Sequence, residues 1–235
     1  MGDQVCQECH KEKAASYFAT AHHSTSRNPT SLSVLGDFRP KFNQLPSGSP
    51  VLHYEMTRKP SGFYESSVIQ ISPTQEIRQT ERIDLAVGSG RRGQTYLFWK
   101  GDQLFELPVT YWTASKSWVN SPGYPDDVPR FDRPVVPRCL ECHSSSFVVK
   151  GTVNEYQRDS LVLGIQCEVC HGPGREHAAM RRRHTSAAKE NDAVIDIAAL
   201  PSDRQLDLCA LCHAGAGQSL APALSFKPGD RLADD

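Results

Sequence analysis

The alternation of apolar and polar residues first singles out a strand-rich stretch in the middle of the chain. Residues 51–57 and 63–71 carry β-branched and aromatic side chains with partial two-residue alternation, which is typical of strands. Two similar runs within residues 94–109 are joined by a Gly-Asp pair and predict a hairpin. We therefore expect a β-rich insertion over residues 51–109.

Other segments carry the composition of short helices and connectors. Residues 11–22 contain good helix formers, and residues 175–189 follow a Gly-Pro-Gly turn. Residues 202–212 begin with Ser and Gln at the spacing of a capping box, so we expect a helix there too. Repeated prolines over residues 120–138 predict an extended connector, and residues 27–50 are rich in loop-forming residues.

A five-residue pattern, Cys-x-x-Cys-His, occurs four times and contains all eight cysteines. We call these occurrences phrases one to four; they consist of Cys6, Cys9 and His10; Cys139, Cys142 and His143; Cys167, Cys170 and His171; and Cys209, Cys212 and His213. The pattern is the attachment site of a c-type haem, in which two thiols bond to the vinyl groups and the histidine ligates the iron. Chance predicts on the order of 0.01 such patterns in this composition. We therefore expect four covalently bound haem c groups.

Paired cysteines have other interpretations, which the histidines argue against. Zinc ribbons and disulfide frameworks do not require a histidine after every second cysteine, and a thioredoxin-like site occurs once, beside a βαβ pattern. The glycine-rich residues 87–93 lack the spacing and context of a nucleotide site, so we interpret them as a flexible loop.

The five histidines outside the phrases are candidate second axial ligands of the irons. His22 ends the helix that starts at phrase one, and His177 follows the turn after phrase three. The further candidates are His53, His184 and His23. An iron with two histidine ligands can pass electrons but cannot bind a substrate. We expect mostly bis-histidine ligation, and the ambiguous number of ligands leaves room for one open iron.

Charge and composition argue against nucleic-acid binding and against a transmembrane segment, and they bear on how the core is built. The formal charge of −1, from 26 basic and 27 acidic residues, gives no support for nucleic-acid binding. No apolar run is long enough for a transmembrane segment. The arginines at positions 181–183 form either a solvated face or partners for haem propionates. Hydrophobic residues make up 38% of the chain, so we expect haems to complete a lean core.

Haem c is attached after export, so we expect a periplasmic or extracellular protein. The chain begins without a signal peptide. We therefore expect that Met1 and Gly2 are an engineered start or that the export signal was trimmed. Residues 227–235 have the composition of a linker, which suggests one module of a longer protein.

Several residues together resemble the cytochrome c-554-type multihaem cytochromes. They are the four phrases, the Ala21-His22 pair after phrase one, and the Cys-His-Gly-Pro-Gly-x-x-His run that ends at His177. The segments at residues 88–91, 107–109 and 121–124 resemble bacterial members of this group, some of which carry further C-terminal domains.

This resemblance implies a mainly helical fold with closely stacked haem pairs that relays electrons between redox partners outside the cytoplasm. It also implies that His177 is a distal ligand to a haem other than the third. His22 matches the histidine that follows the first haem helix. In the better-known members one haem lacks a distal protein ligand.

We therefore expect a single tetrahaem cytochrome c domain over residues 1–235, mainly α, with much irregular structure and a small β-rich insertion, in which haems form the core. The favoured function is electron transfer to redox protein partners, since no catalytic constellation other than iron is recognisable. One alternative is a reductase of a small nitrogen or oxygen species at a five-coordinate haem. Another is a self-associating subunit of an extracellular cytochrome filament, with the hairpin at residues 94–109 as an exposed contact.

Overall fold

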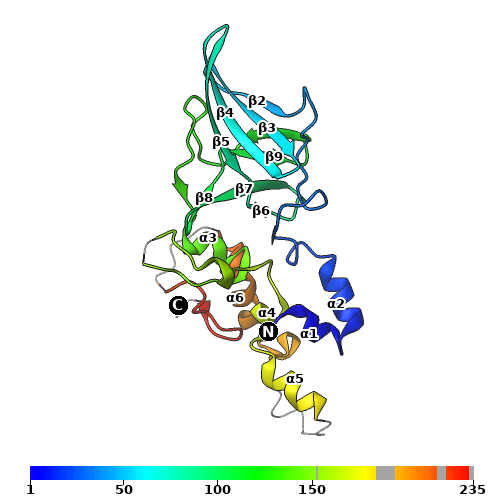
Figure 1. The fold of residues 1–235 in the computed structure, drawn as a ribbon. Coiled ribbons are helices and arrows are strands. Elements are labelled where there is room, and N and C mark those ends of the chain that lie inside the picture. Colours follow the sequence, from blue (N-terminus) through cyan, green and yellow to red (C-terminus); the bar gives the residue numbers. More distant parts are fainter. Residues whose placement is uncertain (152, 184–193, 216–220, 233–235) are drawn as a thin grey trace.

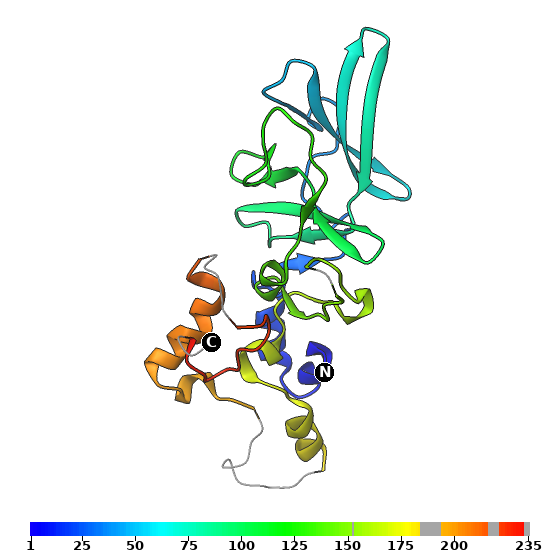
Figure 2. The ribbon, with the colours of Figure 1, turned by 90° about the vertical axis from the view of Figure 1, so that its left-hand side faces the viewer.

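The computed structural model describes residues 1–151, 153–183, 194–215 and 221–232. Strands gather at one end of the molecule and short helices at the other, and both termini lie at the helical end (Figure 1). A view turned by 90° shows the same separation (Figure 2). None of the described helices is long and apolar enough to cross a membrane.

The helices are short. They are α1 (Asp3–Gln7), α2 (Lys11–Phe18), α3 (Pro137–Glu141), α4 (Cys167–His171), α5 (Arg175–Arg182) and α6 (Ser202–His213), with 3-10 turns at Arg158–Ser160 and Ile197–Ala199. The strands are β1 (Ser26–Arg27), β2 (Gln44–Pro46), β3 (Leu52–Lys59), β4 (Gly62–Ser72), β5 (Gln75–Arg82), β6 (Leu85–Val87), β7 (Gly93–Lys100), β8 (Gln103–Glu106), β9 (Val109–Trp112), β10 (Ser117–Asn120), β11 (Arg133–Pro134), β12 (Ser144–Ser146) and β13 (Val162–Leu163).

The expectation of a mainly α fold is wrong, because the described chain has more residues in strands than in helices. The strands form a seven-stranded, a four-stranded and a two-stranded sheet. The four-stranded sheet runs β2-β3-β4-β5, and the larger sheet contains the path β1-β6-β7-β8-β11, with β9 on β7 and β10 on β9. All the paired strands are antiparallel.

The predicted hairpin within residues 94–109 is confirmed, and the two strands predicted over residues 51–57 and 63–71 also pair. Strands β3 and β4 pair in register from Leu52↔Ile69 to Lys59↔Gly62. Strands β7 and β8 meet at Lys100↔Gln103, and Gly101 makes the tight turn between them with a φ of 61°. A positive φ costs little at glycine because it has no Cβ.

Two clusters of buried side chains cover opposite faces of β7. Tyr96 and Phe98 join a cluster with Tyr54, Met56 and other residues of the four-stranded sheet. Leu97, between them in sequence, belongs to a second cluster that includes residues of α3 and the chain beyond it. Successive side chains of a strand point to opposite faces, so one strand serves both cores.

This double burial corrects a second expectation. The hairpin of β7 and β8 is not an exposed contact, because Tyr96, Leu97, Phe98 and Leu104 are all buried. The apolar run in β7 reflects burial on both faces of the sheet.

The predicted helices exist but are shorter or differently capped. The helix expected over residues 11–22 ends at Phe18, and the helix expected over residues 175–189 is described only as far as Arg182. The helix α6 begins at Ser202 without the expected capping box; the Gln205 amide donates instead to the Leu200 carbonyl, at 2.8 Å.

The segment of residues 22–27 connects the two ends of the molecule. The Gly88 N–H donates to the Thr25 carbonyl at 2.6 Å on the sheet side, where β1 pairs with β6. On the other side, the Ile165 N–H donates to the His22 carbonyl at 3.0 Å, and the Gly164 N–H donates to Ser26 Oγ at 2.9 Å. Gly164 has a φ of +72°, and a Cβ there would collide with the His23 carbonyl oxygen.

A buried carboxyl group bridges the two large sheets. Glu65 of β4 is fully buried, and its Oε1 accepts a hydrogen bond from the Val109 N–H of β9 at 2.8 Å. Its Oε2 has no hydrogen-bond partner among the described residues. Burial raises the pKa of Glu65 well above its usual range, because the charged form loses its hydration.

We predict that Glu65→Gln removes a pH-dependent loss of stability. A carboxyl whose folded-state pKa is raised stabilises the fold below its unfolded pKa, about 4.3, and this stabilisation is lost as the pH rises through the folded-state pKa. The free energy of unfolding in urea should therefore fall with rising pH in the unmodified protein more steeply than in the variant. Equal slopes in both proteins between pH 4 and 8 would contradict this account of Glu65.

Gly164→Ala should destabilise the junction. The left-handed backbone alone costs about 1–2 kcal/mol for a residue with a Cβ, and the collision with the His23 carbonyl adds to it, for a total of roughly 2–4 kcal/mol in urea unfolding. Gly101→Ala is the matched control, because Gly101 also has a positive φ but open space around its Cβ position. An equal loss in both variants would show that the close approach at Gly164 does not matter.

Candidate haem-attachment sites

All four phrases lie on or directly beside short helices at one end of the molecule (Figure 1). Phrase one begins in α1 and ends just before α2, phrase two begins in α3 and ends just after it, phrase three forms α4, and phrase four occupies the last turns of α6. Residues three and four apart share one side of a helix, so phrases three and four each present their two thiols and imidazole together. All eight cysteines are free thiols.

Cysteines of different phrases lie beside one another. The side chains of Cys6 and Cys167 lie close enough to shift each other's pKa, which brings phrases one and three together. The side chains of Cys142 and Cys212 do the same for phrases two and four. Cys170 of phrase three lies close enough to Cys209 of phrase four for their charges to interact. These contacts connect the phrases in the order one, three, four, two.

The surroundings of the thiols shift their pKa values in different directions. The neighbouring Cys212 thiol, together with the Arg138 guanidinium, lowers the pKa of Cys142 to about 7, while the closeness of Cys142 raises the pKa of Cys212. Burial, together with the nearby Asp3 carboxylate, raises the pKa of Cys167 to about 12.

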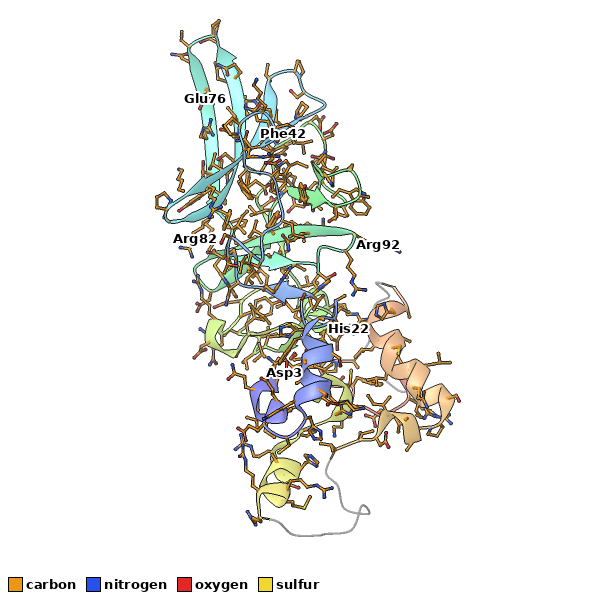
Figure 3. The ribbon with its side chains drawn as sticks, turned by 90° about the vertical axis from the view of Figure 1, so that its right-hand side faces the viewer. Asp3, His22, Phe42, Glu76, Arg82 and Arg92 are labelled. Carbon is orange, nitrogen blue, oxygen red and sulfur yellow. The ribbon has the colours of Figure 1, made fainter. Side chains whose placement is uncertain are left out.

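Two histidine pairs face each other across the helices. The rings of His10 and His177 are stacked, with centroids 6.0 Å apart and an interplanar angle of 21°. The centroids of His22 and His213 are 6.1 Å apart, with an interplanar angle of 70°. His22 lies between the end of α2 and α6 (Figure 3). Each pair thus joins a phrase histidine to one of the two first candidates for a second ligand.

The other two phrase histidines are held through Nδ1. The His143 Nδ1 lies 2.8 Å from Thr25 Oγ1, and the His171 Nδ1 lies 2.9 Å from the Ile195 carbonyl oxygen. A hydrogen bond at Nδ1 leaves Nε2 available as a metal ligand and fixes the direction of the ring. Burial lowers the pKa of His143, which favours the neutral form that binds metal.

The remaining candidates lie elsewhere. His23 packs against the rings of Tyr17 and Phe18, with centroids 5.4 Å and 4.9 Å away, and its Nδ1 is 3.9 Å from the Asp3 carboxylate. His53 belongs to β3 of the four-stranded sheet, at the end of the molecule away from the phrases. His184 lies outside the described residues.

Sequence reasoning missed several residues that hold the phrases together. The buried Asp3 accepts a hydrogen bond from the Cys167 N–H at 2.9 Å, and lies at the helical end of the molecule (Figure 3). Arg138 pairs with Glu141 inside phrase two and donates to the Leu211 carbonyl of phrase four at 2.6 Å. Arg138 directly precedes Cys139, so its closeness to phrase two could have been noticed in the sequence. Nothing in the sequence indicated that Asp3 contacts phrase three.

The arginine run has one described partner in a phrase. Arg182 pairs with Glu8 of phrase one, with 2.6 Å between Nη2 and Oε2. This ion pair joins α5 to the chain between α1 and α2, and both side chains are exposed. An exposed pair of this kind contributes about 1 kcal/mol or less, so it orients α5 more than it stabilises the protein.

The residues present fit covalently bound haem. The thiols are free, the ring centroids of the two histidine pairs are 6.0 Å and 6.1 Å apart, and no described residue of α4, α5 or α6 is buried by the protein. Helices without an apolar face buried in protein need another packing partner, and a haem is a large apolar plate.

Comparisons with known proteins agree with this chemistry. Residues 115–172, which contain phrases two and three, match the family described as cytochrome c554 and c-prime. The crystal structure of the outer cell wall cytochrome OcwA shares the fold, with a TM-score of 0.60 and 17% sequence identity. The match covers 100% of this chain and 44% of that cytochrome, so the chain spans less than half of its length. No curated protein matches the sequence.

The family match supports covalently bound haem c and, in general terms, a role in electron transfer. Together with the repeated attachment phrases, these matches support a multihaem c-type cytochrome.

Proposed function

We propose that the protein carries four haem c groups and conducts electrons along them outside the cytoplasm. The observation that supports this most strongly is the set of cysteine contacts, which connect the phrases in the order one, three, four, two. Each thiol would hold a haem edge, so neighbouring thiols would bring haem edges together. A series of close redox groups is suited to electron relay, for which the protein supplies binding, orientation and electrostatics.

When bound, a haem supplies an iron that gains and loses one electron. His10 and His177 have the separation needed to hold such an iron from opposite sides. A metal–imidazole bond is about 2 Å long and the ring centre lies roughly 1 Å further, so two ligand rings have centroids about 6 Å apart. The observed 6.0 Å agrees with this value. His177 would thus complete the phrase-one iron from helix α5.

His22 and His213 would hold the phrase-four iron in the same way, at 6.1 Å. The large angle of 70° between their planes does not prevent ligation, because each ring can turn about its own metal–nitrogen bond. His22 is supplied by the junction segment, so the chain next to the sheets contributes directly to a site on α6. Held by two histidines each, these two irons would exchange electrons without binding a substrate.

Phrases two and three differ from this pattern. Among the ring contacts of the described residues, neither His143 nor His171 faces another imidazole. This favours, as a second candidate function, reduction of a small nitrogen or oxygen species at one five-coordinate iron. His184, a candidate second ligand, lies outside the described residues.

The partners we propose are redox proteins or further copies of the chain. The near-neutral charge of −1 offers no strong field to attract one sign of partner. A filament subunit would need electron exchange between neighbouring copies, and the buried hairpin of β7 and β8 is not available for that contact.

We predict that removing either proposed distal histidine opens one iron. The measurement is the change in the optical spectrum when carbon monoxide is added to the dithionite-reduced protein. In His177→Ala and in His22→Ala, the number of haems that respond should rise by one. The physical reason is that carbon monoxide binds a ferrous iron only where the sixth position is free. His53→Ala is the matched control, because His53 lies on β3, and it should leave the spectrum unchanged.

The carbon monoxide response of the unmodified protein distinguishes electron relay from reductase activity in the same experiment. No carbon monoxide shift before mutation supports the electron relay, and a shift of one haem equivalent supports the reductase. If His177→Ala and His22→Ala bind no more carbon monoxide than the unmodified protein, the proposed ligand pairs are wrong.

A further inference from the structure

We propose that Thr25 is a positioning residue for His143 and raises its strength as an electron donor to the iron of phrase two. The inference rests on the proposed function, because it requires a haem at phrase two. It assigns a role in electron transfer to a residue that belongs to no attachment phrase and ligates no iron.

Thr25 and Ser26 hydrogen-bond to the phrase-two histidine, His143, at its ring and at its backbone carbonyl. Thr25 Oγ1 lies 2.8 Å from His143 Nδ1, and Ser26 Oγ donates a hydrogen bond to the His143 carbonyl oxygen. Ser26 is buried and also accepts the Gly164 N–H. Both the backbone and the ring of His143 are therefore held by two adjacent residues that are distant in sequence.

The direction of the ring hydrogen bond follows from metal binding. When Nε2 of a neutral imidazole binds iron, the ring proton is on Nδ1, so His143 must donate and Thr25 must accept. Donation from Nδ1 gives the ring partial negative character and makes Nε2 a stronger ligand. A stronger donor stabilises the oxidised iron, so this bond lowers the reduction potential of the haem.

The position of Thr25 is set from the sheet side. Its carbonyl accepts the Gly88 N–H at 2.6 Å, and the next two residues form β1 against β6. Its N–H donates to the His22 carbonyl at 3.3 Å, in the turn that also brings His22 to His213. One turn of chain therefore orients a ligand at phrase four and the ligand at phrase two.

The second phrase histidine held through Nδ1 offers a comparison within the chain. His171 has the Ile195 carbonyl as its partner, at 2.9 Å. A carbonyl oxygen only accepts, whereas a threonine hydroxyl both accepts and donates and can rotate. Because the partner of His143 is a side chain, that hydrogen bond can be removed by substitution without changing the ligand or the backbone.

The test is redox titration of the haem-loaded protein and its Thr25→Val, Thr25→Ser and Thr113→Val variants. In Thr25→Val, one of the midpoint potentials should rise. Mutating a residue that hydrogen-bonds to a metal ligand typically has an effect of about 10-fold or more. A tenfold weaker stabilisation of the oxidised iron corresponds to a rise of about 59 mV in the midpoint potential. Thr25→Ser keeps the hydroxyl and should restore the original potential.

Thr113→Val is the matched control. Thr113 is half-buried like Thr25, and its hydroxyl donates to the Gly90 carbonyl at 2.7 Å, with no contact to a histidine. It should lose a comparable hydrogen bond and leave every midpoint potential unchanged. A potential that rises equally in Thr25→Val and Thr113→Val would reduce the Thr25 effect to general destabilisation and overturn the proposal.

Haem content separates failure of this inference from failure of the proposed function. If the unmodified protein carries no haem at phrase two, the proposed function fails there and the role of Thr25 with it. If four haems are present and Thr25→Val leaves all midpoints unchanged, only the inference fails.

A measurement on the unmodified protein keeps the proposal testable if Thr25→Val does not fold. In the reduced, carbon monoxide-saturated protein, a nuclear Overhauser contact should connect the His143 Nδ1 proton with the Thr25 methyl group. Its absence would overturn the assignment.

Discussion

The hydrogen bonds of residues 22–26 connect the sheets to the cysteine phrases, and the arrangement of the helical end depends on them. The segment bonds to Gly88 on one side and to Gly164 and Ile165 on the other. There is no room for a side chain at Gly164, because its Cβ would collide with the His23 carbonyl oxygen, so the backbone of Gly164 packs directly against the segment. The same residues orient His22 toward His213 and hold His143. We infer that this junction lets the sheets position the histidines at the helical end.

The two ends of the molecule obtain their stability in different ways. The sheets enclose clusters of buried aromatic and aliphatic side chains on both faces of β7. The described parts of α4, α5 and α6 bury no residue, and isolated helices of this length are marginal in water. We infer that haem attachment supplies the packing that the protein does not provide for these helices. The sheets then act as the preformed part, against which the haem-bearing helices are positioned.

The sequence was sufficient to predict the chemistry and part of the geometry. The spacing of Cys139, Cys142 and His143, repeated three more times, predicts attachment sites without any structure. Sequence position also singled out His22, at the end of the helix predicted after phrase one, and His177, which follows the turn after phrase three. In the structure both face phrase histidines. The fold class was misjudged because the helical phrases dominated the interpretation, while short strands such as β6 and β8 have too few residues to show alternation. The roles of Thr25 and Asp3 could not be predicted, because their partners lie more than a hundred residues away and depend on tertiary packing.

The most direct test of the account is the intact mass of the exported, purified protein under denaturing conditions, in which only covalently attached groups remain. The account predicts a mass increase of four haem groups, and peptide mapping that assigns one haem to each phrase. A mass increase of fewer haems would contradict four-haem loading, and a haem missing from phrase three or four would also contradict a continuous relay, because those phrases lie between phrases one and two. An unmodified mass, with thiols that bind zinc, would contradict haem attachment altogether.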